Sequence, residues 1–330
     1  MTIGITHPRV WQVLDLLSDG EFHSGEVLAE KLGISRASIF NALAEVTEYG
    51  VTLQRIRGRG YRLARPWQRL DSSEISRWMG KSANQFSIEV LSQATSSNSV
   101  LLQRAALGAP SGTVLAVELQ TAGRGRMGRV WYAGLGDSLT FSLLWRFDRG
   151  LNALSGLSLV VGVAMVQALK KLGAQGVHLK WPNDILTAQG KMAGVLIEAQ
   201  GDVFGPSLVV IGIGMNCSQP SSYSSHKIEQ PVSSLEDICA ELPSRNQLLA
   251  VLLQALSAAL NDFSSNGFAS QRVAWEQLHY FQNKLLKLHL PDGTVVSGIS
   301  RGVNERGELC LESSHGIQHF NSGEIEGLKA

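Results

Sequence analysis

The 330-residue sequence predicts an α+β protein built from three domains. Three observations support this fold class: two short helical patterns followed by a basic β-hairpin, a middle region of apolar strands joined by tight turns, and a final segment that alternates apolar and polar residues. Strands joined by tight turns pair antiparallel, which disfavours a doubly wound parallel sheet. We expect the domains to cover residues 1–65, 66–280 and 281–330.

The first domain has the pattern of a winged helix-turn-helix. After a helix at "PRVWQVLDLL", the stretches "HSGEVLAEKLG" and "SRASIFNALAEVTEYG" predict two more helices. Ser24 and Ser35 are the expected N-caps, and Gly33 is expected to end the first of the two. "VTLQRIRGRGYRLA" then predicts a hairpin, and residues 55–65 contain five arginines and no acids. This charge favours contact with DNA phosphates, although a protein-interaction module remains the alternative. The candidate DNA contacts are Ser35, Arg36, Ser38 and Asn41 in the third helix, with Arg57 and Arg59 in the wing.

The middle region predicts a mixed sheet with covering helices. Helices are expected near 98–107, 154–172 and 246–265, and apolar strand patterns lie at 113–120, 138–147, 177–186, 192–199 and 207–216. The very apolar stretch 154–173 contains Gly and Ser and ends in two lysines, which favours a buried core helix over a membrane span. The Ser-rich stretch 217–237 is interpreted as a loop that covers the substrate, with disorder as the alternative.

The last segment predicts the fold of the third domain, and the overall composition limits the class of function. Four short β patterns with glycine turns between 284 and 330 predict a small barrel. The three cysteines are far apart and form no CxxC pair, which fits a reducing cytoplasm and disfavours a zinc site. The net charge of +1 means that any nucleic-acid affinity must come from a local patch.

The stretch "GRGRMG" at 123–128 fits the G-x-G-x-x-G pattern of dinucleotide-binding proteins. A strand is predicted before it, but the following "RVWYAGLGDS" has no helical pattern, so an NAD-dependent dehydrogenase is disfavoured. A loop of glycines and arginines is suited to holding an anion through guanidinium groups and close backbone approach.

Three further stretches accompany this loop: "ATSSNSVLL", "LKWPNDILTAQGKMAG" and "VVIGIGMNC". Each has an ordinary structural explanation, as a helix cap, a turn with a surface lysine, and a buried strand. Their joint appearance, in this order, indicates one binding site.

With the winged helix and the terminal strands, these motifs resemble the bifunctional biotin–protein ligases that also repress the biotin operon. The resemblance covers almost the whole chain. It implies a central domain similar to class II aminoacyl-tRNA synthetases and a C-terminal SH3-like barrel. It also implies biotin and ATP as substrates, with Mg²⁺ accompanying ATP, and transfer of biotin from biotinyl-5′-AMP to a lysine of the biotin carboxyl carrier protein of acetyl-CoA carboxylase. The expected partners are operator DNA and, when the adenylate is bound, a second copy of the chain; no membrane is expected.

The resemblance also implies roles for single residues. Ser96, Ser97, Asn98 and Gln120 correspond to the ureido end of the biotin site, and Gly123, Arg124, Gly125 and Arg126 to the ligand-binding loop. Lys191 corresponds to the active-site lysine. Lys191 and Arg126 are the catalytic candidates, since fixed cations stabilise the charge that develops on phosphate oxygens. Asn183, Asp184 and Asn216 complete the expected adenylate-binding set, and no protein side chain is assigned to a metal.

This chain departs from the family pattern at two positions. Thr95 replaces a common aspartate, and Met127 replaces a common arginine. Two related functions remain alternatives: a lipoate–protein ligase and a ligand-sensing repressor without ligase activity. Gln120 and Ser96 favour biotin over lipoate, and the intact Lys191 and Arg126 favour a working ligase.

Overall fold

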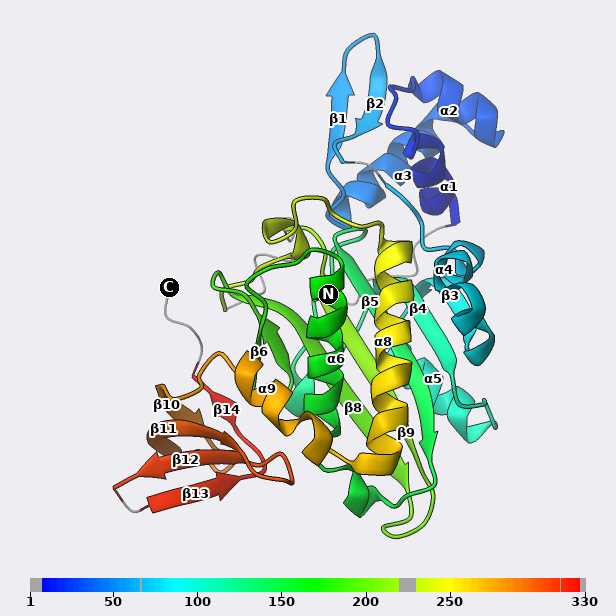
Figure 1. Ribbon diagram of the computed structural model, residues 1–330. Helices are drawn as coiled ribbons and strands as arrows, with labels where there is room; N and C mark the ends of the chain where they lie inside the picture. Colours follow the sequence, from blue (N-terminus) through cyan, green and yellow to red (C-terminus); the bar gives the residue numbers. More distant parts are fainter. Residues whose placement is uncertain (1–7, 66, 220–229, 315, 327–330) are drawn as a thin grey trace.

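A computed structural model describes residues 8–65, 67–219, 230–314 and 316–326. Figure 1 shows a small helical head at the N-terminal end, a large central sheet covered by helices, and a smaller sheet at the C-terminal end. The central sheet is mixed and the terminal sheet is antiparallel, so the predicted α+β class is confirmed.

The head is a helix-turn-helix with a wing. Ser24 and Ser35 cap their helices as predicted, because each side chain accepts a hydrogen bond from the backbone N–H three residues later. Gly33 ends the second helix in a left-handed conformation with φ of 63°. The elements are α1 (Pro8–Leu17), α2 (Gly25–Leu32), α3 (Arg36–Glu48), β1 (Leu53–Ile56) and β2 (Gly60–Leu63).

A short connecting segment, residues 67–71, fastens the head to the central domain. Glu118 accepts a hydrogen bond from the Leu70 backbone N–H at 2.6 Å and forms an ion pair with Arg245 at 2.7 Å. The Arg245 guanidinium also lies over the Trp67 ring. Helix α4 (Ser72–Met79) and the 3₁₀ turn η1 (Gly80–Gln85) follow this segment. Residues 67–71 are thus an ordered part of the interface between the head and the central domain.

The central domain has a seven-stranded sheet in the order β3-β4-β5-β9-β8-β7-β6. The β3–β4 pair is parallel and the other pairs are antiparallel. The strands are β3 (Ser87–Ala94), β4 (Thr113–Gln120), β5 (Ser138–Phe147), β6 (His178–Lys180), β7 (Asp184–Leu186), β8 (Lys191–Gly201) and β9 (Ser207–Asn216).

The strand predictions for this sheet were incomplete in two places. Strand β3 was missed, because it lies at the edge of the sheet and its residues are only partly buried or exposed, so it lacks a continuous apolar pattern. The predicted run 177–186 is two strands rather than one, since Trp181-Pro182-Asn183 turns the chain between β6 and β7.

Helices cover both faces of this sheet. Helices α6 (Leu157–Lys171) and α8 (Arg245–Asn266) pack on one face (Figure 1), and α5 (Ser97–Ala106) packs on the other against Leu144 and Val210. The stretch Leu151–Lys171, which contains α6, and helix α8 are long and apolar enough to cross a membrane by composition, but most of α6 is buried against the sheet, as expected for a core helix. The described residues also form the 3₁₀ turns η2 (Arg126–Gly128), η3 (Leu151–Leu154), η4 (Leu235–Asp237) and η5 (Ala269–Gln271) and the short helix α9 (Arg272–Leu278).

The C-terminal domain is a five-stranded antiparallel sheet in the order β13-β12-β11-β10-β14. The four predicted strands are present, and the short β14 adds a fifth. Among the described residues, the pairing leaves β13 and β14 as edges, so the predicted barrel closure is not detected. The bounds are β10 (Leu285–His289), β11 (Val295–Val303), β12 (Leu309–Ser313), β13 (Gly316–Phe320) and β14 (Glu324–Ile325).

Candidate active site

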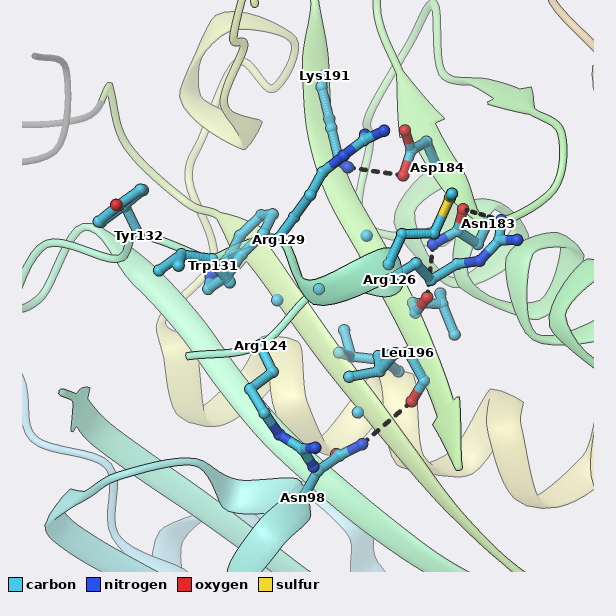
Figure 2. Close-up of a pocket in the computed structure, with 18 of the residues that line it drawn as sticks. Asn98, Arg124, Arg126, Arg129, Trp131, Tyr132, Asn183, Asp184, Lys191 and Leu196 are labelled. Atoms are coloured by element: carbon cyan, nitrogen blue, oxygen red, sulfur yellow. Dashed lines mark hydrogen bonds and ion pairs between the residues drawn. The ribbon is translucent and has the colours of Figure 1, made fainter. Parts of the chain in front are cut away.

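A pocket of about 580 Å³ opens on the α5 side of the central sheet. Its walls come from β4, the arginine loop, the β6–β8 segment and β9, and Gly323 and Glu324 of the C-terminal domain also line it. Figure 2 shows Asn98 at one end and Lys191 with Asp184 at the other. The four motifs that the sequence analysis singled out therefore lie around one cavity.

Glycines on β9 make room on the floor of this pocket. A Cβ atom on Gly212 would lie 2.2 Å from Asn98 Oδ1, and one on Gly214 would lie 2.4 Å from the Trp131 ring. Both distances are far below van der Waals contact. The alternating glycines of "GIGMN" thus let Asn98 and Trp131 lie directly against the sheet.

The first end of the pocket is a buried polar cradle. Ser142 Oγ lies 2.7 Å from Ser97 Oγ and 2.5 Å from Asn98 Oδ1, and Gln120 Oε1 accepts a hydrogen bond from the Ser97 backbone N–H at 2.7 Å. Ser96 precedes α5, but its side chain makes no capping hydrogen bond, which weakens the purely structural explanation. The structure brings all four predicted residues together. Ser142 was missed, although a serine inside the apolar run "TFSLLW" was the available signal.

Arg124 belongs to this same end of the pocket. Glu198 Oε2 accepts hydrogen bonds from Asn98 Nδ2 at 2.8 Å and from Arg124 Nη2 at 2.5 Å. Arg124 is therefore held by Glu198 next to Asn98, which fits an ordering role more closely than contact with phosphates.

The arginine loop folds back on itself. Gly125 N–H donates to Arg129 O at 2.7 Å, and Trp131 N–H donates to Gly123 O at 2.9 Å. A single 3₁₀ turn follows instead of an α-helix, so the loop is not the dinucleotide-binding turn. Arg129 forms an ion pair with Glu324, which joins the loop to the C-terminal domain.

The other end of the pocket gathers positive charge. Lys191 Nζ lies 2.7 Å from Asp184 Oδ1, and the two side chains are only 16% and 14% exposed. Lys191 is therefore not an ordinary solvated surface charge. Arg126 donates to Asn183 Oδ1 at 3.2 Å, and burial lowers the pKa of this arginine. Figure 2 shows Arg126 and Asn183 beside the Lys191–Asp184 pair.

Lys180 is a further cation at this end that sequence reasoning missed. It is 7% exposed and lies opposite Asp184 in the β6–β7 register. Burial lowers the pKa of Lys180, whereas the nearby Asp184 carboxylate opposes that change. A lysine between two apolar residues, in "HLKW", was the signal available in the sequence.

The stretch 217–237 is only partly described. Residues 220–229 lie outside the described residues, so the proposal that this stretch covers the substrate stays a prediction. The part that is described braces Lys191, because Lys191 N–H donates to Pro231 O and Ser233 N–H donates to Lys191 O, both at 2.9 Å. Asn216, at the end of β9, donates to Ser233 O at 3.1 Å.

The predicted DNA-contacting residues lie apart from this pocket, on the head. Ser35 and Ser38 are joined by a hydrogen bond of 3.0 Å between their hydroxyls. Arg36 pairs with Glu26 of α2 at 2.6 Å, and both side chains are 70% exposed. Asn41, Arg57 and Arg59 are exposed, and the Arg59 guanidinium lies 4.6 Å from the centre of the Phe22 ring.

Comparison with known proteins covers all three domains. Residues 9–62 match the model of an HTH domain, residues 90–216 match the biotin/lipoate A/B protein ligase family, and residues 286–326 match the biotin protein ligase C terminal domain. Biotin protein ligase from Aquifex aeolicus, solved in complex with biotin and ATP, is 27% identical and has a TM-score of 0.62. This match covers 74% of the present chain and 99% of that chain.

Two relatives match this chain over almost its whole length. The bifunctional ligase/repressor BirA of Escherichia coli (strain K12) is 39% identical over 315 residues, which cover 95% of each chain. The protein of the same description from Bacillus spizizenii is 30% identical over 93% of this chain and 94% of its own length. Because identity at this level extends from the helix-turn-helix to the last sheet, the chain belongs to the family of bifunctional biotin ligase/repressors.

Proposed function

We propose that this protein activates biotin with ATP and transfers it to a lysine of the biotin carboxyl carrier protein of acetyl-CoA carboxylase, and that it represses biotin-synthesis genes when the adenylate accumulates. One observation supports the proposed ligase activity. A single pocket has a buried polar cradle at one end and Lys191, Lys180 and Arg126 at the other.

The two ends of the pocket suit the two parts of biotinyl-5′-AMP. The ureido group of biotin carries two N–H donors and one carbonyl acceptor, which match the hydroxyl and amide groups of Ser97, Asn98, Gln120 and Ser142. The cationic end suits the phosphate oxygens of Mg²⁺-bound ATP. Lys191 and Arg126 are the residues assigned to phosphate, and Ser96 and Gly125 line the walls that contact the ligand. Gly123 supports the loop from behind, where its backbone packs against Trp131.

The reaction has two steps. A carboxylate oxygen of biotin attacks the α-phosphorus of ATP, the bond from that phosphorus to the bridging oxygen of pyrophosphate breaks, and pyrophosphate leaves. Lys191 and Arg126 stabilise the negative charge that develops on the phosphate oxygens. The amine of the acceptor lysine then attacks the carbonyl carbon of the adenylate, AMP leaves, and the new amide loses one proton. Asn183, Asp184 and Asn216 hold the nucleotide side, with Asp184 also orienting Lys191.

Lipoate is the competing substrate within the wider ligase family. Its dithiolane ring carries neither an N–H donor nor a carbonyl acceptor, so it would form none of the hydrogen bonds that the ureido group of biotin offers to the cradle. Each such hydrogen bond contributes about 0.5–1.5 kcal/mol. Biotin is therefore the favoured acid.

The proposed repressor function is supported by the N-terminal head. Its third helix and its basic wing suit operator DNA, and a homodimer formed by the adenylate-bound protein would present two heads to a palindromic site. Such a protein acts where carboxylase acceptors and operators both occur, in the cytoplasm.

The test is direct. The protein is incubated with MgATP and an isolated biotin carboxyl carrier domain, with biotin in one sample and lipoate in another, and the acceptor is measured by intact mass spectrometry. We expect the mass of one biotinyl group on the acceptor and no lipoyl group. An acceptor that gains lipoyl and not biotinyl mass would overturn the assignment of substrate, and an unmodified acceptor in both samples would overturn the assignment of ligase activity.

A further inference from the structure

The exposed face of α3 carries an apolar stripe. Ala37, Phe40, Asn41 and Ala44 are exposed and follow the i, i+3, i+4, i+7 spacing that places residues on one side of a helix. Phe40 is 57% exposed. The opposite side of α3 already supplies the core of the head, since Ile39, Leu43 and Val46 are buried. Phe40 is therefore not needed to hold the head together.

Charged groups next to the stripe indicate what covers it. The wing carries Arg55, Arg57 and Arg59, all exposed, and Arg36, which pairs with Glu26, lies at the start of the same helix. A surface that combines an apolar centre with flanking arginines suits nucleic acid, where phosphates lie on both sides of the groove and the base edges lie between them. An apolar protein partner would not account for this surrounding positive charge.

Thymine is the base that offers an apolar group in the major groove. Its C5-methyl projects there, and alanine and phenylalanine side chains make apolar contact with it. The carbonyl and amide groups of Asn41, next to Phe40, suit the adenine edge through a bidentate pair of hydrogen bonds. The stripe thus combines groups that match adjacent A·T pairs.

We propose that Phe40, with the small side chains of Ala37 and Ala44 making room beside it, contacts one thymine methyl group in each operator half-site. This inference rests on the proposed repressor function and gives it a sequence preference. Phe40 is then a specificity-determining residue, whereas the wing arginines contact phosphates and carry no base preference. The half-site is rich in A·T pairs where α3 enters the major groove.

The experiment removes the methyl groups without changing base pairing. Full-length protein saturated with biotinyl-5′-AMP selects tight-binding duplexes from a randomised library, and the selected duplex is then synthesised once with thymidine and once with deoxyuridine. Burial of one methyl contributes about 0.8 kcal/mol, or about fourfold in affinity, so one contact in each of two half-sites predicts about a 15-fold weaker complex with deoxyuridine.

Variants assign this effect to Phe40. With Phe40→Ala, we expect weaker binding to the thymidine duplex and little remaining difference between the two duplexes, whereas Phe40→Leu keeps part of the difference. The matched control is Leu107→Ala, which removes an apolar side chain that is 88% exposed on the central domain. This control should bind as the unmodified protein does.

The outcomes separate the inference from the function on which it rests. Equal binding to the two duplexes by the unmodified protein would overturn the reading of thymine methyls while leaving operator binding intact. A methyl preference that persists in Phe40→Ala would overturn the role of Phe40. Failure to select any duplex would overturn the proposed repressor function itself.

Discussion

Replacement of Lys191 by alanine should reduce adenylate formation far more than it reduces stability. The Lys191 ammonium lies 2.7 Å from Asp184 at the cationic end of the pocket. Removing a fixed donor that stabilises transition-state charge costs about 3–4 kcal/mol, which is a loss of about 10²–10³ in rate. Lys191→Arg keeps the charge but changes its reach and planarity, so partial recovery is expected.

The expected loss of stability is smaller because Asp184 keeps another cation nearby. Lys180 lies opposite Asp184 in the β6–β7 register, so the carboxylate is not left without a positive neighbour. The Lys191–Asp184 pair is also not fully buried. We therefore expect the free energy of unfolding to fall by about 1–2 kcal/mol, between the values for exposed and buried pairs.

The assay is pyrophosphate release in a single turnover, with urea unfolding of the same preparation. Transfer from preformed biotinyl-5′-AMP to the acceptor is measured in parallel and should be less affected, because the adenylate has already formed. Lys287→Ala is the matched control, since Lys287 pairs with Glu326 at 3.4 Å on the surface and its side chain is 56% exposed. A near-normal rate of pyrophosphate release in Lys191→Ala would refute the assignment, and so would a rate loss fully explained by unfolding.

Three further predictions concern the pocket floor, the domain junction and the wing. Gly212→Ala places a Cβ atom 2.2 Å from Asn98 Oδ1, so the Asn98 side chain must move. Loss of two hydrogen bonds of Asn98 should weaken biotin binding by about 2 kcal/mol, or about 30-fold, in calorimetric titration. Unchanged affinity would show that Asn98 is not part of the biotin site. His279 is buried between Leu179 O and Ser300 Oγ, and burial lowers its pKa to about 4. The unfolded chain protonates His279 near pH 6.5, whereas the folded chain does not. The free energy of unfolding should therefore be full above that pH and fall by about 3 kcal/mol as the pH drops to about 4. Urea unfolding at several pH values should find this loss diminished in His279→Gln. Arg57→Ala with Arg59→Ala should lower the salt dependence of operator binding by about two units in filter-binding assays, and an unchanged slope would mean that the wing does not contact phosphates.

Local patterns in the sequence were sufficient to predict most of the fold. Ser24, Ser35 and Gly33 mark the helix boundaries of the head through their own backbone preferences, and the structure places the boundaries there. The long helices α6 and α8 and the four C-terminal strands were also predicted, since their apolar periodicity depends only on neighbouring residues. Strand β3 was not, because an edge strand with partly exposed residues lacks such a pattern.

The candidate site was predictable only in part. The residues of the arginine loop, the "SSN" segment and Lys191 were identified from their motifs and their order along the chain. Lys180, Ser142 and Glu198 were missed, because each is an isolated polar residue within a strand. The apolar neighbours of Lys180 and Ser142 indicate burial, but they do not show which pocket or partner the side chain meets. Only the packing of α5 on the sheet brings Asn98 against Ser142, and only the pairing of β6 with β7 places Lys180 opposite Asp184.

The sequence by itself determined which residue types are present, where most of the helices and strands lie, and to which family the motifs point. Tertiary structure alone decided which end of the pocket each charge occupies. Arg124 and Arg126 are two positions apart in the loop, yet Glu198 of β8 holds one beside Asn98 and Asn183 holds the other beside Lys191. The physical reason is that hydrogen bonds and ion pairs between distant segments depend on sheet register, and register is set by packing of the whole domain rather than by the residues that form the bond.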